Sequence, residues 1–88
     1  MILNWMEIRK QYPDKFVLVE AISAYSKENK RIIEEMSVLE EHASSRAAWS
    51  SYKKLHREFP ERELYIFHTS KEQIEVEEQH FIGVRGRV

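Results

Sequence analysis

The stretch from Glu63 to Gly86 constrains the fold most, because it contains two limbs that are typical of β-strands. Residues 63–69 (ELYIFHT) are rich in aromatic and β-branched side chains and lead into a polar cluster. Residues 73–84 carry apolar side chains mainly at alternate positions, as on a strand with one buried face. Two such runs around a short polar connection predict a β-hairpin. We expect this hairpin to be part of the sheet on which the rest of the chain packs.

Length and composition predict one small soluble domain. The chain has 88 residues, enough for a single core, so residues 1–88 are assigned to one domain. Its 14 basic and 15 acidic side chains are well mixed and give a net charge of −1. This balance makes nucleic-acid binding unlikely, because such proteins usually gather basic residues on one face. Without cysteine the chain has no disulfide and no Cys-based zinc site.

No targeting or membrane segment is expected. Residues 1–7 lack the apolar core and the cleavage site of a signal peptide. No apolar run approaches the roughly 20 residues that a membrane helix needs. We therefore predict a cytoplasmic location and no membrane association.

Residues 4–12 are predicted to form a short helix. Asn4 is a favourable N-cap, and Glu7 three residues later completes a capping box. Trp5 and Ile8 then share one face, and Pro13 ends the helix. A helix this short requires tertiary contacts for its apolar face.

Residues 44–59 are predicted to form the main helix, with Ser44 or Ser45 as N-cap and Pro60 as the stop signal. Its polar residues point away from one apolar stripe. We expect that stripe to be buried, and its main members are Trp49, Tyr52, Leu55 and Phe59.

Between the helices we predict a second hairpin. Residues 16–22 begin with four apolar side chains in a row, which is typical of a strand covered on both faces. Residues 23–30 are polar and include Asn29, which tolerates positive φ, so they are interpreted as the connection. The periodicity of residues 31–39 fits an amphipathic helix better than a strand, and one long helix from Val17 onward stays an alternative.

Five short motifs extend over most of the chain, from Asn4 to Gly86: NW-x-EIRKQYP, FVLVEA, RIIEEMSVL, YIFHTS and F-I-G-V-R-G. Together they resemble a family of small uncharacterised bacterial proteins of unknown function. The resemblance implies a strand over residues 31–39. It also implies a protein partner, a retropepsin-like aspartic protease encoded nearby. The predicted fold class is then α+β: a short N-terminal helix followed by a ββαββ two-layer sandwich, whose four-stranded antiparallel sheet is covered by one main helix, residues 45–59.

A chain of this size buries only a modest core, so association with a second copy or a partner would add stability. A homodimer is one such association, and a complex with a partner protein is the other. The predicted core residues come from every predicted element except residues 31–39, and they are Trp5, Phe16, Leu18, Trp49, Tyr52, Leu55, Phe59, Ile66, Ile74 and Ile82.

No pattern of residues predicts catalysis, a cofactor or a metal site. Of the four histidines, His42 and His56 have no other histidine at helical spacing. In the predicted hairpin, His68 and His80 lie on the order of 20 Å apart, too far to share an ion. His68 and Thr69 would point to opposite faces of their strand. There is also no nucleophile elbow and no phosphate-binding loop, so we predict that the protein is not an enzyme.

The predicted hairpin leaves one set of side chains without an assigned contact, and we predict it as an interaction surface: Tyr65, Phe67, Phe81 and Arg85. Three roles stay open for it, namely the seam of a homodimer, a platform for stacked bases, or contact with the N-terminal helix and Trp5. The predicted function is a non-enzymatic protein-interaction or regulatory module that associates through a sheet face or edge, with itself or with a partner protein. The alternative is a nucleic-acid-binding regulator of the antitoxin type.

Overall fold

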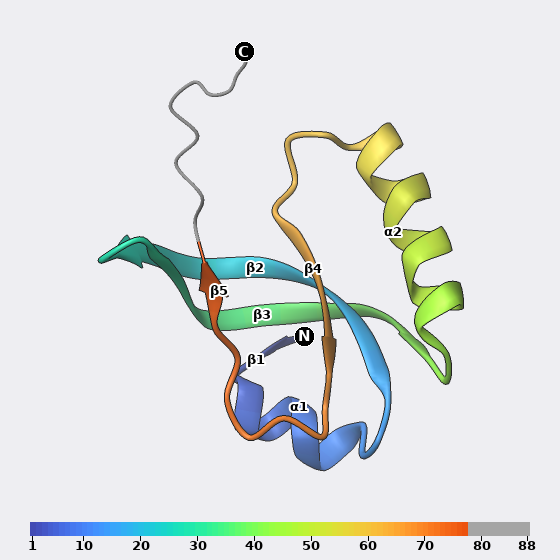
Figure 1. Ribbon diagram of the computed structural model, residues 1–88, viewed down its shortest axis with the longest axis horizontal. Coiled ribbons are helices and arrows are strands. Elements are labelled where there is room, and N and C mark those ends of the chain that lie inside the picture. The colour runs from blue at the N-terminus through green and yellow to red at the C-terminus, as the bar shows by residue number, and fades with distance from the viewer. Residues whose placement is uncertain (78–88) are drawn as a thin grey trace.

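A long antiparallel hairpin of two strands, β2 (Phe16–Lys27) and β3 (Lys30–His42), forms the frame of the protein. The computed structural model describes residues 1–77. The sheet has the order β1-β3-β2-β4, and β5 pairs with β3 (Figure 1). This arrangement confirms the predicted α+β fold with a four-stranded antiparallel sheet. The remaining elements are β1 (Ile2–Leu3), α1 (Trp5–Gln11), α2 (Ser45–Glu58), β4 (Leu64–His68) and β5 (Val76–Glu77).

The hairpin turns at Glu28 and Asn29, which have positive φ values of 51° and 65°. Two successive residues with positive φ are typical of a type I′ turn, whose twist matches that of the flanking strands. Asn29, which the sequence marks as a residue that tolerates positive φ, adopts one in this turn. The connection is shorter than predicted, because most of residues 23–30 continue the two strands.

Residues 31–39 form part of β3, as the resemblance implied and contrary to the helical periodicity. The register between β2 and β3 shifts near Leu18, Ala21 and Ser23. Each irregularity changes which face the following residues occupy. Ile33 and Met36 therefore both contact the same core, although an unbroken strand would place them on opposite faces. Because of these irregularities, the apolar residues of β3 do not alternate along the sequence as they would in a regular strand.

The predicted pairing between residues 63–69 and 73–84 is wrong within the described part of the chain. β4 pairs with β2, and Val76 in β5 pairs with Arg31 in β3. The intervening loop therefore leads from the edge of the sheet at β4 to the other edge, at β3. The indole Nε1 of Trp5 donates a hydrogen bond of 2.9 Å to the carbonyl of Lys71 in this loop. Alternating apolar residues define the faces of a strand but not its partner. Residues 78–84 lie outside the described residues.

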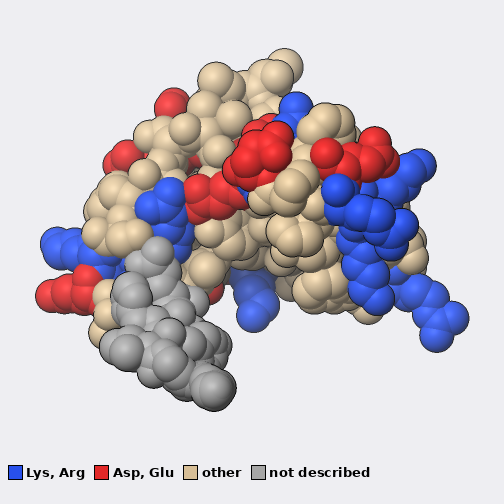
Figure 2. Space-filling view, turned by 90° about the horizontal axis from the view of Figure 1, so that it is seen from above, with Lys and Arg blue, Asp and Glu red and all other residues tan. Residues whose placement is uncertain are grey.

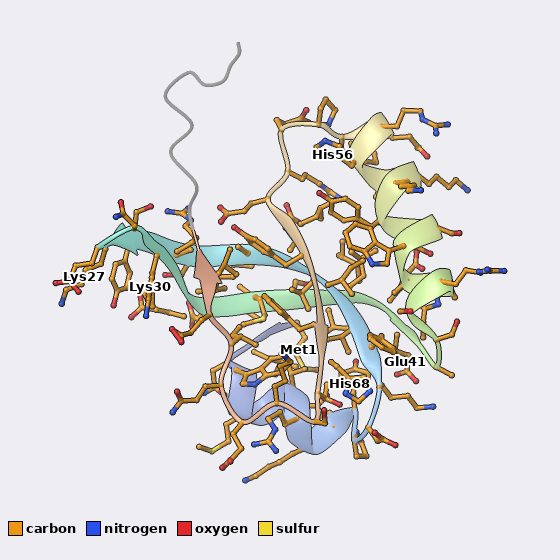
Figure 3. The ribbon with its side chains drawn as sticks, in the orientation of Figure 1. Met1, Lys27, Lys30, Glu41, His56 and His68 are labelled. Atoms are coloured by element: carbon orange, nitrogen blue, oxygen red, sulfur yellow. The ribbon has the colours of Figure 1, made fainter. Side chains whose placement is uncertain are left out.

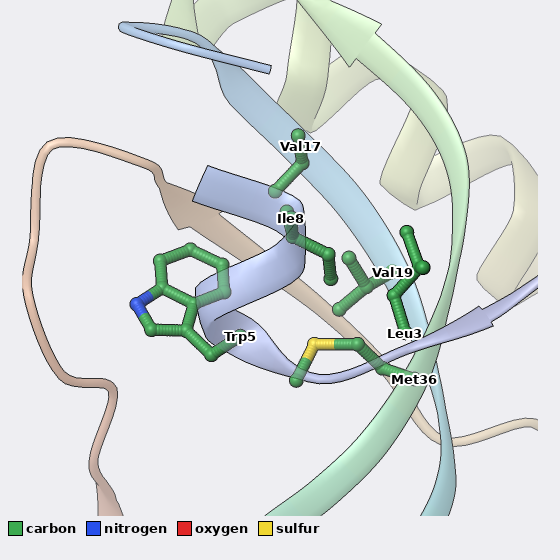
Figure 4. Packing of buried hydrophobic residues seen from close by; sticks show 6 residues of the cluster. All are labelled: Leu3, Trp5, Ile8, Val17, Val19 and Met36. Carbon is green, nitrogen blue, oxygen red and sulfur yellow. The ribbon is translucent and has the colours of Figure 1, made fainter. Parts of the chain in front are cut away.

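α1 covers one face of the sheet. Its predicted capping box is present: the Asn4 side chain accepts from the backbone N–H of Glu7, and the Glu7 carboxylate accepts from that of Asn4, both at 2.9 Å. Ile8 is fully buried between α1 and the sheet. Burial of a side chain of this size contributes about 1.5–3 kcal/mol. The buried cluster on this face consists of Leu3, Trp5, Ile8, Val17, Val19 and Met36 (Figure 4).

α2 packs against the opposite face, where Leu18 and Leu64 are buried. Ala48 is the residue of α2 that is fully buried, and its small side chain allows the helix to approach the sheet closely. Trp49, the next residue, lies at the rim of this contact and is 52% exposed. The prediction that Trp49 and Phe59 belong to a buried stripe is therefore wrong.

The remaining core predictions are confirmed in part. Trp5 and Leu18 are buried, and Ile82 lies outside the described residues. The half-buried members are Phe16, Tyr52, Leu55, Ile66 and Ile74.

Candidate functional site

A groove runs along β4, between α2 and the segment that leads to β5 (Figure 3). It consists of two adjoining hollows of about 490 and 370 Å³. Ile66 and Phe67 line both hollows although they point to opposite faces of β4, so the groove lies at the edge of this strand. Trp49 of α2 and Glu75 also line both. We call the space bounded by these four residues the β4 groove.

The edge of β4 at this groove has no strand beside it within residues 1–77, where only β2 pairs with β4. The backbone N–H of Thr69 donates to the carbonyl of Lys15, on the β2 side, at 2.9 Å. Because the direction of these bonds alternates along an antiparallel strand, Leu64 and Ile66 direct their N–H and C=O groups away from β2. The groove thus borders backbone donors and acceptors that no described residue pairs.

Trp49 begins a row of aromatic rings along α2. Its ring meets that of Tyr52 edge to face, with centroids 5.2 Å apart. Tyr52 in turn stacks on His56 at 5.6 Å, with an interplanar angle of 4°. These contacts hold the half-exposed indole at the groove, where it offers apolar area to another molecule.

The structure places two of the predicted interaction residues partly in the core. Tyr65 and Phe67 are half-buried against the cluster that α1 covers, and Phe67 meets Trp5 edge to face at 5.6 Å. Contact with Trp5 at the N-terminal helix, one of the three roles left open, is therefore observed for Phe67. Tyr65 and Phe67 both also line the β4 groove. Phe81 and Arg85 lie outside the described residues, so the surface formed by all four stays a prediction.

Sequence reasoning missed Trp49 and the edge of β4 that stays unpaired in the described part of the chain. It placed Trp49 in the core by helical periodicity and paired the edge with residues 73–84. The available signal was charge: Arg46 and Lys53 precede and follow Trp49 by three and four residues. At these spacings they are its neighbours on the helix surface, which places the indole at the boundary of the apolar stripe.

A charged cluster joins β3 to the start of β4 on the face that α1 covers. Arg31 donates to both carboxylate oxygens of Glu63, at 2.7 and 2.9 Å, and the Tyr65 hydroxyl donates to Glu63 at 2.6 Å. Arg31 lowers the pKa of Glu63. Burial, followed by the bond to Glu63, raises the pKa of Tyr65 to about 12. These hydrogen bonds link β3 to the start of β4.

A second polar cluster joins β3 to α2. The Nε2 atom of His42 lies 2.9 Å from Glu40 Oε1 and 3.2 Å from Ser51 Oγ. The hydrogen bond from Ser51 is the largest cause of the lowered pKa of Glu40. A hydrolytic relay requires the carboxylate and the hydroxyl on different ring nitrogens, and here both are on Nε2.

His68 forms a local turn at the end of β4. Its Nδ1 accepts from the backbone N–H of Ser70 at 3.2 Å and lies 2.8 Å from Ser70 Oγ. Asp14 lies 3.7 Å from Nε2, and its side chain is 91% exposed. Among the residues that the structure describes, no three His, Cys, Asp or Glu side chains are grouped so as to hold a metal ion. His80 falls outside them.

In comparisons with protein-family models, curated proteins and solved structures, nothing matches this chain. No helix in residues 1–77 is long and apolar enough to cross a membrane. Function is therefore inferred from the β4 groove and the groups around it.

Proposed function

We propose that this chain is a non-enzymatic protein-interaction module that binds through the edge of its sheet, at the β4 groove. The observation that supports this is the 52% exposed Trp49 beside backbone groups of Leu64 and Ile66 that nothing in residues 1–77 pairs. An open strand edge is a template for hydrogen bonds to another chain, and an adjacent aromatic ring adds apolar contact area. The two features together provide both parts of strand-addition binding.

The proposal includes two kinds of partner. One is a second copy of the chain, and the other is a different protein, such as the retropepsin-like protease that the resemblance implies. A cytoplasmic location is part of the same proposal. Light scattering on the purified chain distinguishes the first partner from the second, because only self-association doubles the mass as concentration rises.

Nucleic-acid binding by a regulator of the antitoxin type is the second candidate. It is supported by the composition of α2, which contains Trp49, four Lys or Arg residues and one Glu. The net charge of −1 favours a protein partner instead. A salt titration with single-stranded RNA and DNA tests this candidate, because phosphate contacts are strongest at low salt. If no binding is detected even at low salt, the candidate is rejected.

Site-specific photocrosslinking in the native cell tests the main proposal. A p-benzoylphenylalanine in place of Trp49 lies in the groove, and the same residue in place of Met6, which is 66% exposed on α1, is the matched control. We expect one discrete adduct from the groove position and none from α1, with the cross-linked site on the partner confined to one segment. The proposal fails if both positions give the same adducts or if the groove position gives none.

A further inference from the structure

Basic side chains flank Trp49 on the surface of α2. Arg46 and Lys53 lie one turn to either side of it along the helix. Figure 2 shows Lys and Arg side chains gathered on the side of the molecule that α2 forms. Neither Arg46 nor Lys53 has an ion pair with any residue that the structure describes.

The opposite wall of the β4 groove does not cancel this charge. Its carboxylate, Glu75, lies 2.7 Å from Nζ of Lys30, and this hydrogen bond lowers the pKa of Glu75. Lys71 also lines this wall and, within residues 1–77, has no acidic partner. Among the described residues, the charge that is left without an opposite partner is therefore positive on both walls: Arg46 and Lys53 on one, Lys71 on the other.

The two basic side chains lie within reach of an extended chain that passes Trp49, although their spacing along α2 is somewhat shorter than that of side chains on one face of a strand. Side chains on one face of a strand repeat about every 6.6–6.8 Å. Along α2, Arg46 and Lys53 lie about 4.5 and 6 Å from Trp49, at about 1.5 Å per residue. A strand added to β4 that placed an apolar side chain against Trp49 would carry its next side chains on that face close to the two basic residues.

We infer that the β4 groove takes an extended acidic segment of a partner protein as an added strand, with the pattern acidic–x–apolar–x–acidic. This inference rests on the proposed function and specifies its partner. The apolar residue packs on Trp49 and Ile66, and the two acidic residues reach Arg46 and Lys53. The intervening residues face the side of β4 that carries Phe67.

The backbone of β4 favours a peptide over a nucleic acid as the occupant. Leu64 and Ile66 present both N–H donors and C=O acceptors at the edge, and an adjacent strand satisfies both in alternation. Phosphate groups supply acceptors only, so they cannot satisfy the carbonyl groups of this edge. A basic peptide would satisfy the backbone but would be repelled by Arg46 and Lys53.

A peptide titration followed by NMR on the full 88-residue chain tests the inference. The probe is acetyl-Thr-Glu-Val-Ile-Val-Glu-Thr-amide, and its charge control has Lys in place of both Glu residues. We expect the probe to shift the amide signals of Leu64 and Ile66 and the indole signal of Trp49. The Lys peptide should bind at least tenfold more weakly, because its charges face those of α2.

Two further comparisons separate strand addition from simple charge attraction. Two versions of the probe are N-methylated at alternate residues. One should lose binding and the other retain it, because only alternate amides of an added strand face β4. The double variant Arg46→Gln/Lys53→Gln should weaken the acidic peptide about tenfold. The matched double variant Lys10→Gln/Lys27→Gln, at exposed sites elsewhere, should leave its binding unchanged.

Several outcomes overturn the inference. These are equal binding of the Glu and Lys peptides, equal binding of the two methylated peptides, or no shift at β4 with millimolar probe. It is also overturned if the protein alone shows the same shifts as its concentration rises, which identifies a second copy. Displacement of the probe by heptauridylate together with tighter binding of that RNA identifies a nucleic-acid site. A discrete adduct from position 49 without peptide binding refutes the acidic segment and leaves the proposed function intact.

Discussion

The neutral Tyr65 side chain should contribute to the free energy of unfolding, and this contribution should be lost at alkaline pH. Its pKa is raised to about 12 from 10.0, first by burial and then by the hydrogen bond to Glu63. The folded state thus favours the neutral phenol, so this contribution is complete below pH 10 and is lost as the pH rises toward 12. A pKa that is about 2 higher in the folded than in the unfolded state corresponds to about 2.7 kcal/mol of unfolding free energy. Because the side chain is only half-buried, we expect solvent screening to reduce the loss to about 1–2 kcal/mol.

The variant Tyr65→Phe isolates this effect. At pH 8 it should lower the free energy of unfolding by about 1–2 kcal/mol, because the hydrogen bond to the Glu63 carboxylate is lost. The difference from the wild type should then shrink to about half by pH 11, since the wild type loses the same contribution by ionisation between pH 10 and 12. Urea unfolding at a series of pH values from 8 to 11, followed by tryptophan fluorescence, measures both curves.

Tyr25→Phe is the matched control, because Tyr25 is 45% exposed in the outer part of the β2–β3 hairpin. Its curve should run parallel to that of the wild type at every pH. A difference between Tyr65→Phe and the wild type that stays constant from pH 8 to 11 would refute the assignment. The assignment would also be refuted if the free energies of unfolding of Tyr65→Phe and Tyr25→Phe approached that of the wild type to the same extent as the pH rises.

Three further predictions concern the fold. Ile8→Ala should lower the free energy of unfolding by about 2–5 kcal/mol in urea denaturation, because it opens a cavity at a fully buried site. The control Met6→Ala, at a site that is 66% exposed, should change this free energy by less than about 0.5 kcal/mol. Thr69→Val should cost about 2 kcal/mol, since the buried hydroxyl donates to the carbonyl of Tyr12 at 2.6 Å, and recovery in Thr69→Ser distinguishes this loss from a change in packing. Glu28→Asn should raise the free energy of unfolding and Glu28→Val should lower it, by about 0.5–1 kcal/mol in each direction, because Glu28 has a φ of 51°. Thermal melts of the two variants check this, and equal melting temperatures would contradict the turn assignment.

The features that the sequence determined by itself are local. The capping box of Asn4 and Glu7 and the positive φ of Asn29 involve only neighbouring residues, and both are present. Both helices, α1 and α2, also begin and end close to the capping residues and prolines from which they were predicted. These features were predictable because their hydrogen bonds and backbone preferences depend on residues within one or two turns.

Tertiary structure decided the features that the proposed site depends on. Residues 31–39 joined the hairpin despite their helical periodicity, because bulges shifted the faces of the strand. β4 paired with β2 and not with the segment after it, which left its other edge unpaired within the described residues. Ala48 took the contact with the sheet, and Trp49 was left half-exposed at the groove. Periodicity shows which residues share a face, but the element that covers a face is chosen by backbone pairing and packing between distant segments, which no local pattern encodes.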